Sequence, residues 1–235
     1  MSYTVTENDI LSIPADGAVL ALEMTGRVAL GPAGDRLVRA GGETLRQAIR
    51  KAGFVSVGRA AALEDCGLPF GRLILTATPR FLTGKANELK MLRLCYESVF
   101  ALADELGLRT LALPFLSTMY YRFPQAEGVH IALQEAESWS GEARFAAETP
   151  ELLALSRTPY RRPRIVSYVG WYRDQAIFRL DNGHFARVDL RPERREADTV
   201  PYVEACCHAG NNPLQTSLPP EEIDRLRRLW EELNT

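Results

Sequence analysis

Short apolar runs alternate with amphipathic segments in the chain up to about Arg157. The apolar runs resemble buried strands, whereas the amphipathic segments repeat their apolar residues at helical spacing. The expected strands are Gly17 to Leu22, Arg72 to Thr78, Thr110 to Phe115 and, as a last edge strand, Arg144 to Ala147. The expected helices are Asp35 to Ala52, Asn87 to Leu106, Pro124 to Trp139 and Thr149 to Arg157. This alternation predicts an α/β domain over residues 1–157.

The helix expected over Asn87 to Leu106 has the clearest pattern of the four. One continuous apolar face is formed by Leu89, Leu92, Tyr96, Val99, Ala103 and Leu106. Gly107 then supplies a common C-terminal stop. The helix over Asp35 to Ala52 is weaker, because Gly41 and Gly42 lie in its middle.

The pattern changes at residues 158–164, which carry two prolines and three arginines and are expected to form an extended linker. Beyond it we predict a small β-rich extension over residues 165–235, with a closing helix from about Pro219 to Leu233. Asp181-Asn182-Gly183 is typical of a β-hairpin turn. The strands expected in this extension are Ile165 to Tyr172, Ala176 to Leu180 and Phe185 to Leu190.

Composition excludes some classes of protein. A formal net charge of −2 argues against bulk binding of nucleic acid, and we do not expect nucleic acid as a partner. Basic and aromatic residues do alternate from Tyr160 to Arg173, which suits either a single-stranded nucleic-acid surface or a linker followed by core aromatics. No apolar stretch approaches the roughly 20 residues that span a bilayer. Met1 to Asn8 lacks the features of a signal peptide, so we expect a cytoplasmic protein.

The four cysteines are typical of a reduced chain. Cys206-Cys207-His208 resembles a metal cluster at first sight. Adjacent strand residues point to opposite faces, however, and no second Cys/His pair of zinc-site spacing follows. We therefore predict packed cysteines, no metal site and no cofactor.

Several short motifs occur in the order and spacing of the macro domain family. They are Asn8-Asp9-Ile10 with Ala15 to Val19, Gly31 to Leu45, Gly58-Arg59-Ala60 with Leu68-Pro69 and Leu73 to Leu75, Leu94 to Ser98, Leu113 to Thr118, and Phe123-Pro124. Residues 1–157 therefore resemble a macro domain. The resemblance implies a three-layer α/β/α fold with a mixed central sheet, and binding of ADP-ribose-type nucleotides.

The resemblance implies a cleft between two loops, residues 23–35 and 117–123, which clamp the phosphates of the ligand in the family. The physics of open α/β sheets agrees, because ligands bind where strand ends lead into helix N-termini. The implied ligand-binding residues are Asp9, Ile10, Gly31, Gly34, Ser117, Thr118, Tyr121 and Arg122.

Particular roles follow from the resemblance. Asp9 matches the position that accepts a hydrogen bond from the adenine amino group, and a turn or cap aspartate is the alternative. Ile10 would lie beside the base or simply in the core. Gly31 and Gly34 match phosphate-loop glycines or form a turn, and Tyr121 lies beside the distal ribose or on the surface.

The chain departs from the family pattern in both loops. Family hydrolases carry Asn-Ala-Ala-Asn where this chain has Leu20-Ala21-Leu22-Glu23, and Pro32 replaces a glycine. In the second loop both family glycines are missing, and Met119 and Arg122 would be strained there or displace the ligand if those sites need positive φ. Arg122 could instead bind phosphate, or fill the pocket by pairing with Glu23 or Asp35.

Three functions remain open from the sequence. The first is a module that binds ADP-ribose or a related nucleotide diphosphate. The second is an ADP-ribosyl or phosphoester hydrolase with Glu23 or Asp35 as base, although Asp35 could equally cap the following helix. The third is a ligand-free assembly domain whose extension makes a homodimer or binds protein or RNA. The missing asparagine and glycines favour binding over catalysis.

Overall fold

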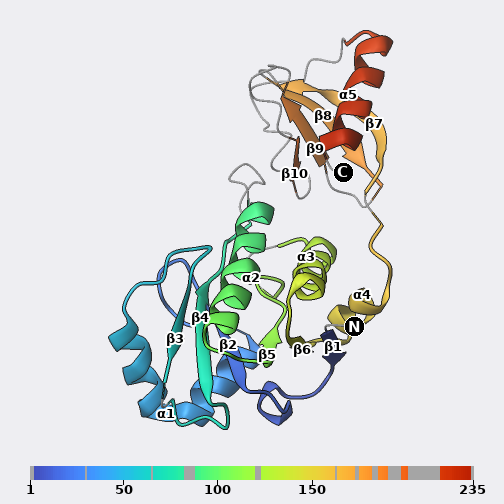
Figure 1. Ribbon diagram of the computed structural model, residues 1–235. Helices are drawn as coiled ribbons and strands as arrows, with labels where there is room; N and C mark the ends of the chain where they lie inside the picture. The colour runs from blue at the N-terminus through green and yellow to red at the C-terminus, as the bar shows by residue number, and fades with distance from the viewer. Residues whose placement is uncertain are drawn as a thin grey trace. The chain divides into compact units, whose positions relative to one another are not determined.

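The chain folds into two compact units, the first ending at Tyr160 and the second beginning at Arg161. The structure, a computed structural model, describes residues 3–29, 31–64, 66–81, 88–119, 123–161, 163–172, 175–181, 185–189, 197–200 and 218–233. Figure 1 shows the helices and strands of both units.

The first unit is built on a six-stranded sheet with the strand order β1-β6-β5-β2-β4-β3. The strands are β1 (Tyr3–Thr6), β2 (Gly17–Leu22), β3 (Ala60–Leu63), β4 (Arg72–Ala77), β5 (Thr110–Pro114) and β6 (Glu142–Ala146). All neighbours pair in parallel except β3, which runs antiparallel to β4. The mixed central sheet expected from the resemblance is confirmed.

The central strands are buried on both faces, which explains their continuous apolar sequences. In β2, Val19 belongs to one hydrophobic cluster, while Ala18 and Leu20 belong to another on the opposite face. The same alternation occurs in β5, where Leu113 and Ala112 face opposite ways. Each face therefore needs its own cover of helices.

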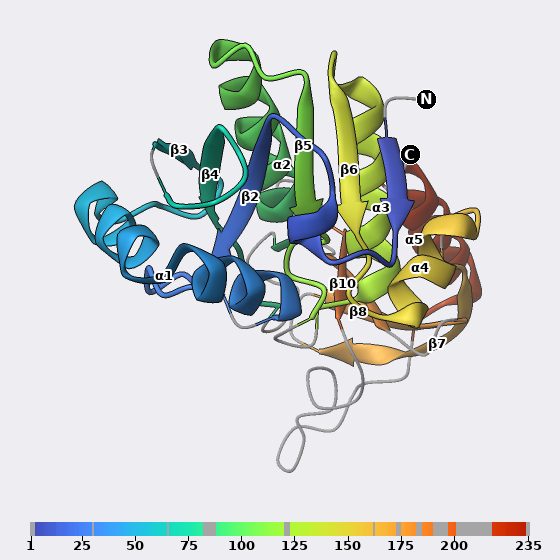
Figure 2. The same cartoon turned by 90° about the horizontal axis from the view of Figure 1, so that it is seen from below.

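Helices cover both faces of this sheet. They are α1 (Pro32–Ala52), α2 (Glu88–Glu105), α3 (Gln125–Ser138) and α4 (Pro150–Arg157), with a short 3-10 helix η1 (Ile10–Ser12). Leu37 and Leu45 of α1 belong to one cluster, whereas α2, α3 and α4 contribute to the other. Figure 2 shows α1 on one side of the strands and α2 and α3 on the other. The predicted three-layer α/β/α architecture is thus confirmed.

Some boundaries and positions differ from the sequence prediction. The strand predicted at Arg144 to Ala147 is not an edge strand, because β6 lies between β1 and β5. The edges are β1 and β3, two four-residue strands that carry no long apolar run. Helix α1 begins three residues earlier than expected, at Pro32, and is kinked where Gly42 has φ 54°. The glycine pair therefore bends the helix, as its low helical propensity allows.

The second unit is a four-stranded antiparallel sheet with the order β10-β9-β8-β7. Its elements are β7 (Ile165–Tyr172), β8 (Gln175–Leu180), β9 (Phe185–Asp189), β10 (Ala197–Val200) and α5 (Pro220–Leu233). Leu226 of α5 packs with Phe178 and Val188 of the sheet, so the helix covers one face. The expected β-rich unit with a closing helix is present, and β10 is an additional strand. The Cys206-Cys207-His208 cluster lies outside the described residues.

Among the described helices, none has the length and apolar character needed to cross a membrane.

Candidate functional site

A pocket opens at the carboxyl ends of β2 and β5, where the two predicted loops begin. Its walls are formed by Val19, Leu20, Ala21, Ala29, Gly31, Gly34, Thr78, Pro114, Phe115, Leu116, Ser117, Met119 and Glu148. The cavity volume is about 30 Å³, enough for about two water molecules. Such a space accepts one small group of a ligand, and the remainder would extend outward.

The first loop is held by backbone hydrogen bonds close to its strand. Glu23 N–H donates to the Arg27 carbonyl at 2.6 Å, and Ala29 N–H donates to the Ala21 carbonyl at 2.9 Å. Gly34 then approaches the loop so closely that a Cβ would lie 2.8 Å from the Ala29 carbonyl oxygen. A side chain at position 34 would therefore push the loop away from α1.

Glu23 is engaged beside this loop. Its Oε2 lies 3.6 Å from a guanidinium nitrogen of Arg80 and accepts a hydrogen bond from the Thr25 hydroxyl at 3.2 Å. Glu23 is not among the residues that form the pocket wall. The pairing proposed for Glu23 with Arg122 is not tested, because Arg122 lies outside the described residues.

The start of α1 is capped by a residue that the sequence analysis missed. Gly31 is the N-cap and makes no side-chain cap hydrogen bond, and Pro32 has no N–H. Oε1 of Glu148 accepts a hydrogen bond from the Ala33 amide at 2.7 Å instead. Burial is the main cause of the raised pKa of the Glu148 carboxyl, and the charge of Asp35 adds to it.

Asp35 itself neither caps α1 nor lies in the loop. It is exposed in the first turn of the helix, and its amide donates to the Gly31 carbonyl at 2.9 Å. The interpretation of Asp35 as the N-cap was wrong because the helix starts at Pro32. An acidic residue in the first turn still interacts favourably with the helix dipole.

In the second loop the strain falls on Ser117. Ser117 has φ 65°, and it is the only non-glycine residue in the described part of the chain that lies in the left-handed region. Its hydroxyl donates to the Pro79 carbonyl at 3.1 Å, which holds it beside the pocket. Met119 forms part of the wall and packs against the core without positive φ. Backbone strain was expected at Met119, but the positive φ lies two residues earlier, at Ser117.

Thr118 lies beneath the second loop, not in the pocket wall. It is buried, and its hydroxyl donates to the Phe115 carbonyl at 2.8 Å. The side-chain amide of Gln125, at the start of α3, donates to the Thr118 carbonyl at 3.2 Å. These bonds tie the loop to the helix that follows it.

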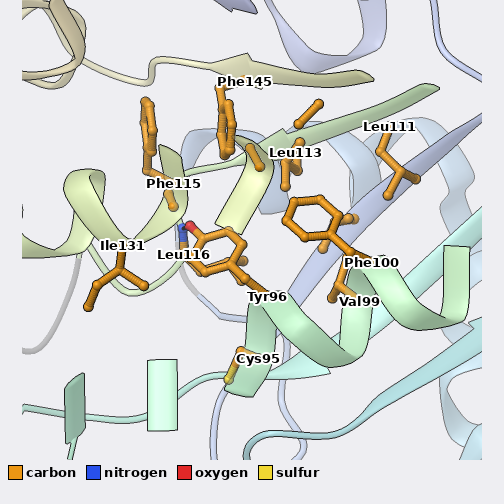
Figure 3. Close-up of a cluster of buried hydrophobic side chains, with 14 of the residues drawn as sticks. Cys95, Tyr96, Val99, Phe100, Leu111, Leu113, Phe115, Leu116, Ile131 and Phe145 are labelled. Carbon is orange, nitrogen blue, oxygen red and sulfur yellow. Dashed lines mark hydrogen bonds between the residues drawn. The ribbon is translucent and has the colours of Figure 1, made fainter. Parts of the chain in front are cut away.

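Tyr96 anchors the second loop from below. Its hydroxyl oxygen accepts a hydrogen bond from the Leu116 amide at 2.7 Å, and Figure 3 shows the Tyr96 hydroxyl pointing at Leu116. Complete burial raises the pKa of Tyr96, so the phenol stays protonated. Phe115 and Phe145 stack beside it with ring centroids 4.7 Å apart. Cys95, next to it, donates to the Ala77 carbonyl, and burial raises the pKa of this thiol to about 11.

Asp9 and Ile10 begin the short helix η1, which packs against α1 and β5. Oδ1 of Asp9 accepts a hydrogen bond from the Leu11 amide at 3.2 Å, and Oδ2 lies 3.4 Å from Nε of Arg36. The Ile10 side chain is buried in the core that α1 covers. Both residues lie outside the pocket wall described above.

The structure thus brings together three of the predicted ligand-binding residues, Gly31, Gly34 and Ser117. Tyr121 and Arg122 lie outside the described residues. Met119, which was expected at the ligand in the second loop, is a wall residue, whereas sequence reasoning missed Thr78 and Glu148. A usable signal existed for Glu148, since it follows the last strand of the sheet at the same carboxyl edge. Within the described part of the chain, no cluster of three or more His, Cys, Asp or Glu residues is placed to hold a metal ion.

The three-layer sandwich with a pocket at its strand ends defines the class of protein. A family model described as "Macro domain" matches residues 22–132. An uncharacterized protein from Fusobacterium nucleatum is 35% identical over 133 residues, which are 54% of this chain and 73% of the relative. "O-acetyl-ADP-ribose deacetylase 1" from Pantoea vagans is 33% identical over 147 residues, 60% of this chain and 84% of the relative. The chain belongs to the macro domain family.

Solved structures agree on the fold. The Oceanobacillus iheyensis macrodomain with ADP superposes with a TM-score of 0.61 at 19% identity, covering 66% of this chain and 87% of that one. The Trypanosoma brucei macrodomain in complex with ADP-ribose gives a TM-score of 0.58 at 22% identity, covering 66% and 67%. At these identities the likeness establishes the architecture of the first unit.

Proposed function

We propose that the first unit is a module that binds ADP-ribose or a related nucleotide diphosphate. The ligand lies in the cleft between the loops at residues 23–35 and 117–123. The observation that carries the proposal is the convergence of Gly31, Gly34 and Ser117 on one pocket at the carboxyl ends of β2 and β5. Backbone amides at such a strand-to-helix junction suit phosphate or hydroxyl groups.

The proposed site extends beyond the pocket wall. Asp9 and Ile10 recognise the base, Ser117 and Thr118 shape the second loop, and Tyr121 and Arg122 contact the distal ribose and the phosphates. Family membership supports this assignment, and so do the names of solved relatives that carry ADP or ADP-ribose.

Isothermal titration of the full chain with ADP-ribose, ADP and AMP tests the proposal. We expect saturable binding, with Asp9→Asn lowering the affinity for ADP-ribose about tenfold by removing a charged acceptor. Glu7→Gln is the matched control, because Glu7 is an exposed carboxylate two residues away. Absence of heat with millimolar ADP-ribose would refute the binding function.

A hydrolase is the second candidate, because two relatives at 32–33% identity are named O-acetyl-ADP-ribose deacetylases. Glu23 and Asp35 are the proposed bases. The contacts of Glu23 with Arg80 and Thr25 fix the position of its carboxylate, which lies away from the pocket wall. Unchanged turnover in both Glu23→Gln and Asp35→Asn would exclude these two residues as bases.

For the rest of the chain we propose a linker at residues 158–164 and an extension over 165–235 that supports a homodimer. The independent core of the second unit, with α5 on one sheet face, supports a separate role for it. Light scattering on the full chain measures this directly, and a monomeric mass at all concentrations contradicts the dimer. The proposed location of the protein is the cytoplasm.

A further inference from the structure

A carboxylate lines the pocket at the point where an anionic ligand group would bind. Glu148 follows β6 and lies in the pocket wall with Gly31, Gly34 and Ser117. Its Oε1 is 2.7 Å from the Ala33 nitrogen, in the first turn of α1. Helix N-termini attract anions because their first amides lack partners within the helix.

The protein itself supplies the anion at this helix start. Gly31 contributes no side-chain cap, and Pro32 contributes no amide hydrogen. A residue more than a hundred positions away in sequence therefore satisfies the Ala33 amide. A ligand phosphate at this amide would have to displace the Glu148 carboxylate.

The surrounding charges add to this conflict. Glu148 accepts from the Ala33 amide and interacts electrostatically with the Asp35 carboxylate of α1 and the Tyr96 hydroxyl of α2. None of these three is a cation. Burial and the charge of Asp35 both raise the pKa of Glu148, which means that negative charge is already disfavoured there. A phosphate beside Glu148 would be repelled by both carboxylates.

We propose that Glu148 is a specificity-determining residue, whose carboxylate takes the place of an anionic ligand group at the start of α1. The pocket then prefers a hydroxyl or another hydrogen-bond donor there over a phosphate. This inference rests on the proposed nucleotide-binding function and narrows its ligand class. Ligands that present a nucleoside hydroxyl to Glu148, with their phosphates directed away, fit the pocket best.

Three proteins and three probes test this proposal. The full chain, Glu148→Gln and Glu151→Gln are titrated with ADP-ribose, adenosine and inorganic pyrophosphate. Glutamine keeps an oxygen that accepts from the Ala33 amide and removes the charge. Glu151 is the matched control, since it is an exposed carboxylate on α4 three residues further on. Thermal melts establish that each variant is folded.

We expect Glu148→Gln to bind ADP-ribose about tenfold more tightly than the natural chain, with little change for adenosine. Glu151→Gln should behave like the natural chain. An unchanged ratio of ADP-ribose to adenosine affinity in Glu148→Gln overturns the proposal. If the natural chain binds neither ADP-ribose nor adenosine, the proposed function fails, and pyrophosphate decides about Glu148. If Glu148→Gln binds pyrophosphate and the natural chain does not, the proposed role of Glu148 is supported. If neither Glu148→Gln nor the natural chain binds pyrophosphate, that role is refuted.

Discussion

Each end of the central sheet has a carboxylate that accepts hydrogen bonding from backbone amides, but the pKa is lowered at one end and raised at the other. At the amino end, Oδ2 of Asp16 accepts from the Arg109 and Thr110 amides at 2.9 Å each. The pKa of Asp16 is lowered, mainly by the hydrogen bond from the Arg109 amide. Hydrogen bonding with Thr110 and the charge of Arg144 lower it further. At the carboxyl end Glu148 has one amide partner, is partly buried, and has a raised pKa.

The difference between the two pKa shifts distinguishes the amino end of the sheet, which we call the structural end, from the carboxyl end with its pocket, which we call the functional end. Asp16 is exposed and accepts two backbone hydrogen bonds, so that its charge stabilises the strand junction between β2 and β5. Glu148 is held in a pocket where its charge is disfavoured. Disfavoured charges concentrate at sites of function, because a ligand or a proton can relieve them.

The largest effect is expected at the functional end, from Tyr96→Phe. The change leaves the buried Leu116 amide without its acceptor, which costs about 2 kcal/mol of unfolding free energy. We also expect weaker binding of ADP-ribose, since Leu116 and Ser117 line the pocket. Denaturant unfolding and titration measure the two effects.

Tyr3→Phe is the control for the Tyr96 change. Both rings contact Phe145 edge-on at 6.5 Å, but Tyr3 lies on the edge strand and is partly exposed. A loss of stability in Tyr3→Phe as large as in Tyr96→Phe would show that the hydrogen bond to Leu116 is not the cause.

At the structural end, Asp16→Asn is expected to lower the unfolding free energy at pH 7 by about 1 kcal/mol, because exposed hydrogen bonds to a charged group contribute modestly. The lowered pKa fixes the sign of the pH dependence. The contribution of Asp16 is present above its ordinary pKa of 3.8 and is lost as the pH falls through the lower folded value. Unfolding curves from pH 3 to 8 should therefore converge at the acid end, and a constant difference contradicts this origin.

The sequence predicted the fold best in segments with a clear pattern of apolar residues. The face of Leu92, Tyr96 and Val99 predicted α2 and its burial, and the apolar run from Gly17 to Leu22 predicted β2. The edge strands were missed because β1 and β3 are only four residues long and partly exposed, and because the Ala-Ala-Ala-Leu sequence of β3 lacks the β-branched and aromatic residues that mark a strand.

The site was predicted in outline, as two loops at one sheet edge, but not in its contacts. Glu148 and Ala33 are more than a hundred residues apart, and only the strand order brings β6 close enough for the carboxylate to reach α1. Strain was expected at Met119 and Arg122 if those sites need positive φ, whereas the described part of the second loop has its positive φ at Ser117 and not at Met119. Long-range partners and local φ values depend on the assembled fold, which no short motif specifies.

A smaller effect is expected from Glu148→Gln on stability, and its sign is opposite to that at Asp16. A carboxyl whose pKa is raised in the folded state stabilises the fold below its ordinary pKa of 4.5, and this contribution is lost as the pH rises through the raised value. Removing the charge should therefore raise the melting temperature at pH 8 and change it little at pH 4. A lower melting temperature at pH 8 would mean that the charge-assisted cap outweighs burial and the repulsion from Asp35.

The smallest net effect is expected at Ser117, where two contributions oppose each other. Ser117→Gly relieves a left-handed conformation that costs a non-glycine residue about 1 kcal/mol, but it loses the hydrogen bond to the Pro79 carbonyl, which is worth about the same. Ser117→Ala loses the hydrogen bond and keeps the strain, so it should be about 1 kcal/mol less stable than the glycine variant. The difference between the two variants, from chemical denaturation, isolates the strain. Equal stabilities would show that the loop relaxes around alanine. The second loop would then hold no backbone strain, and the disfavoured charge of Glu148 would be the one unfavourable feature tested at the carboxyl end of the sheet.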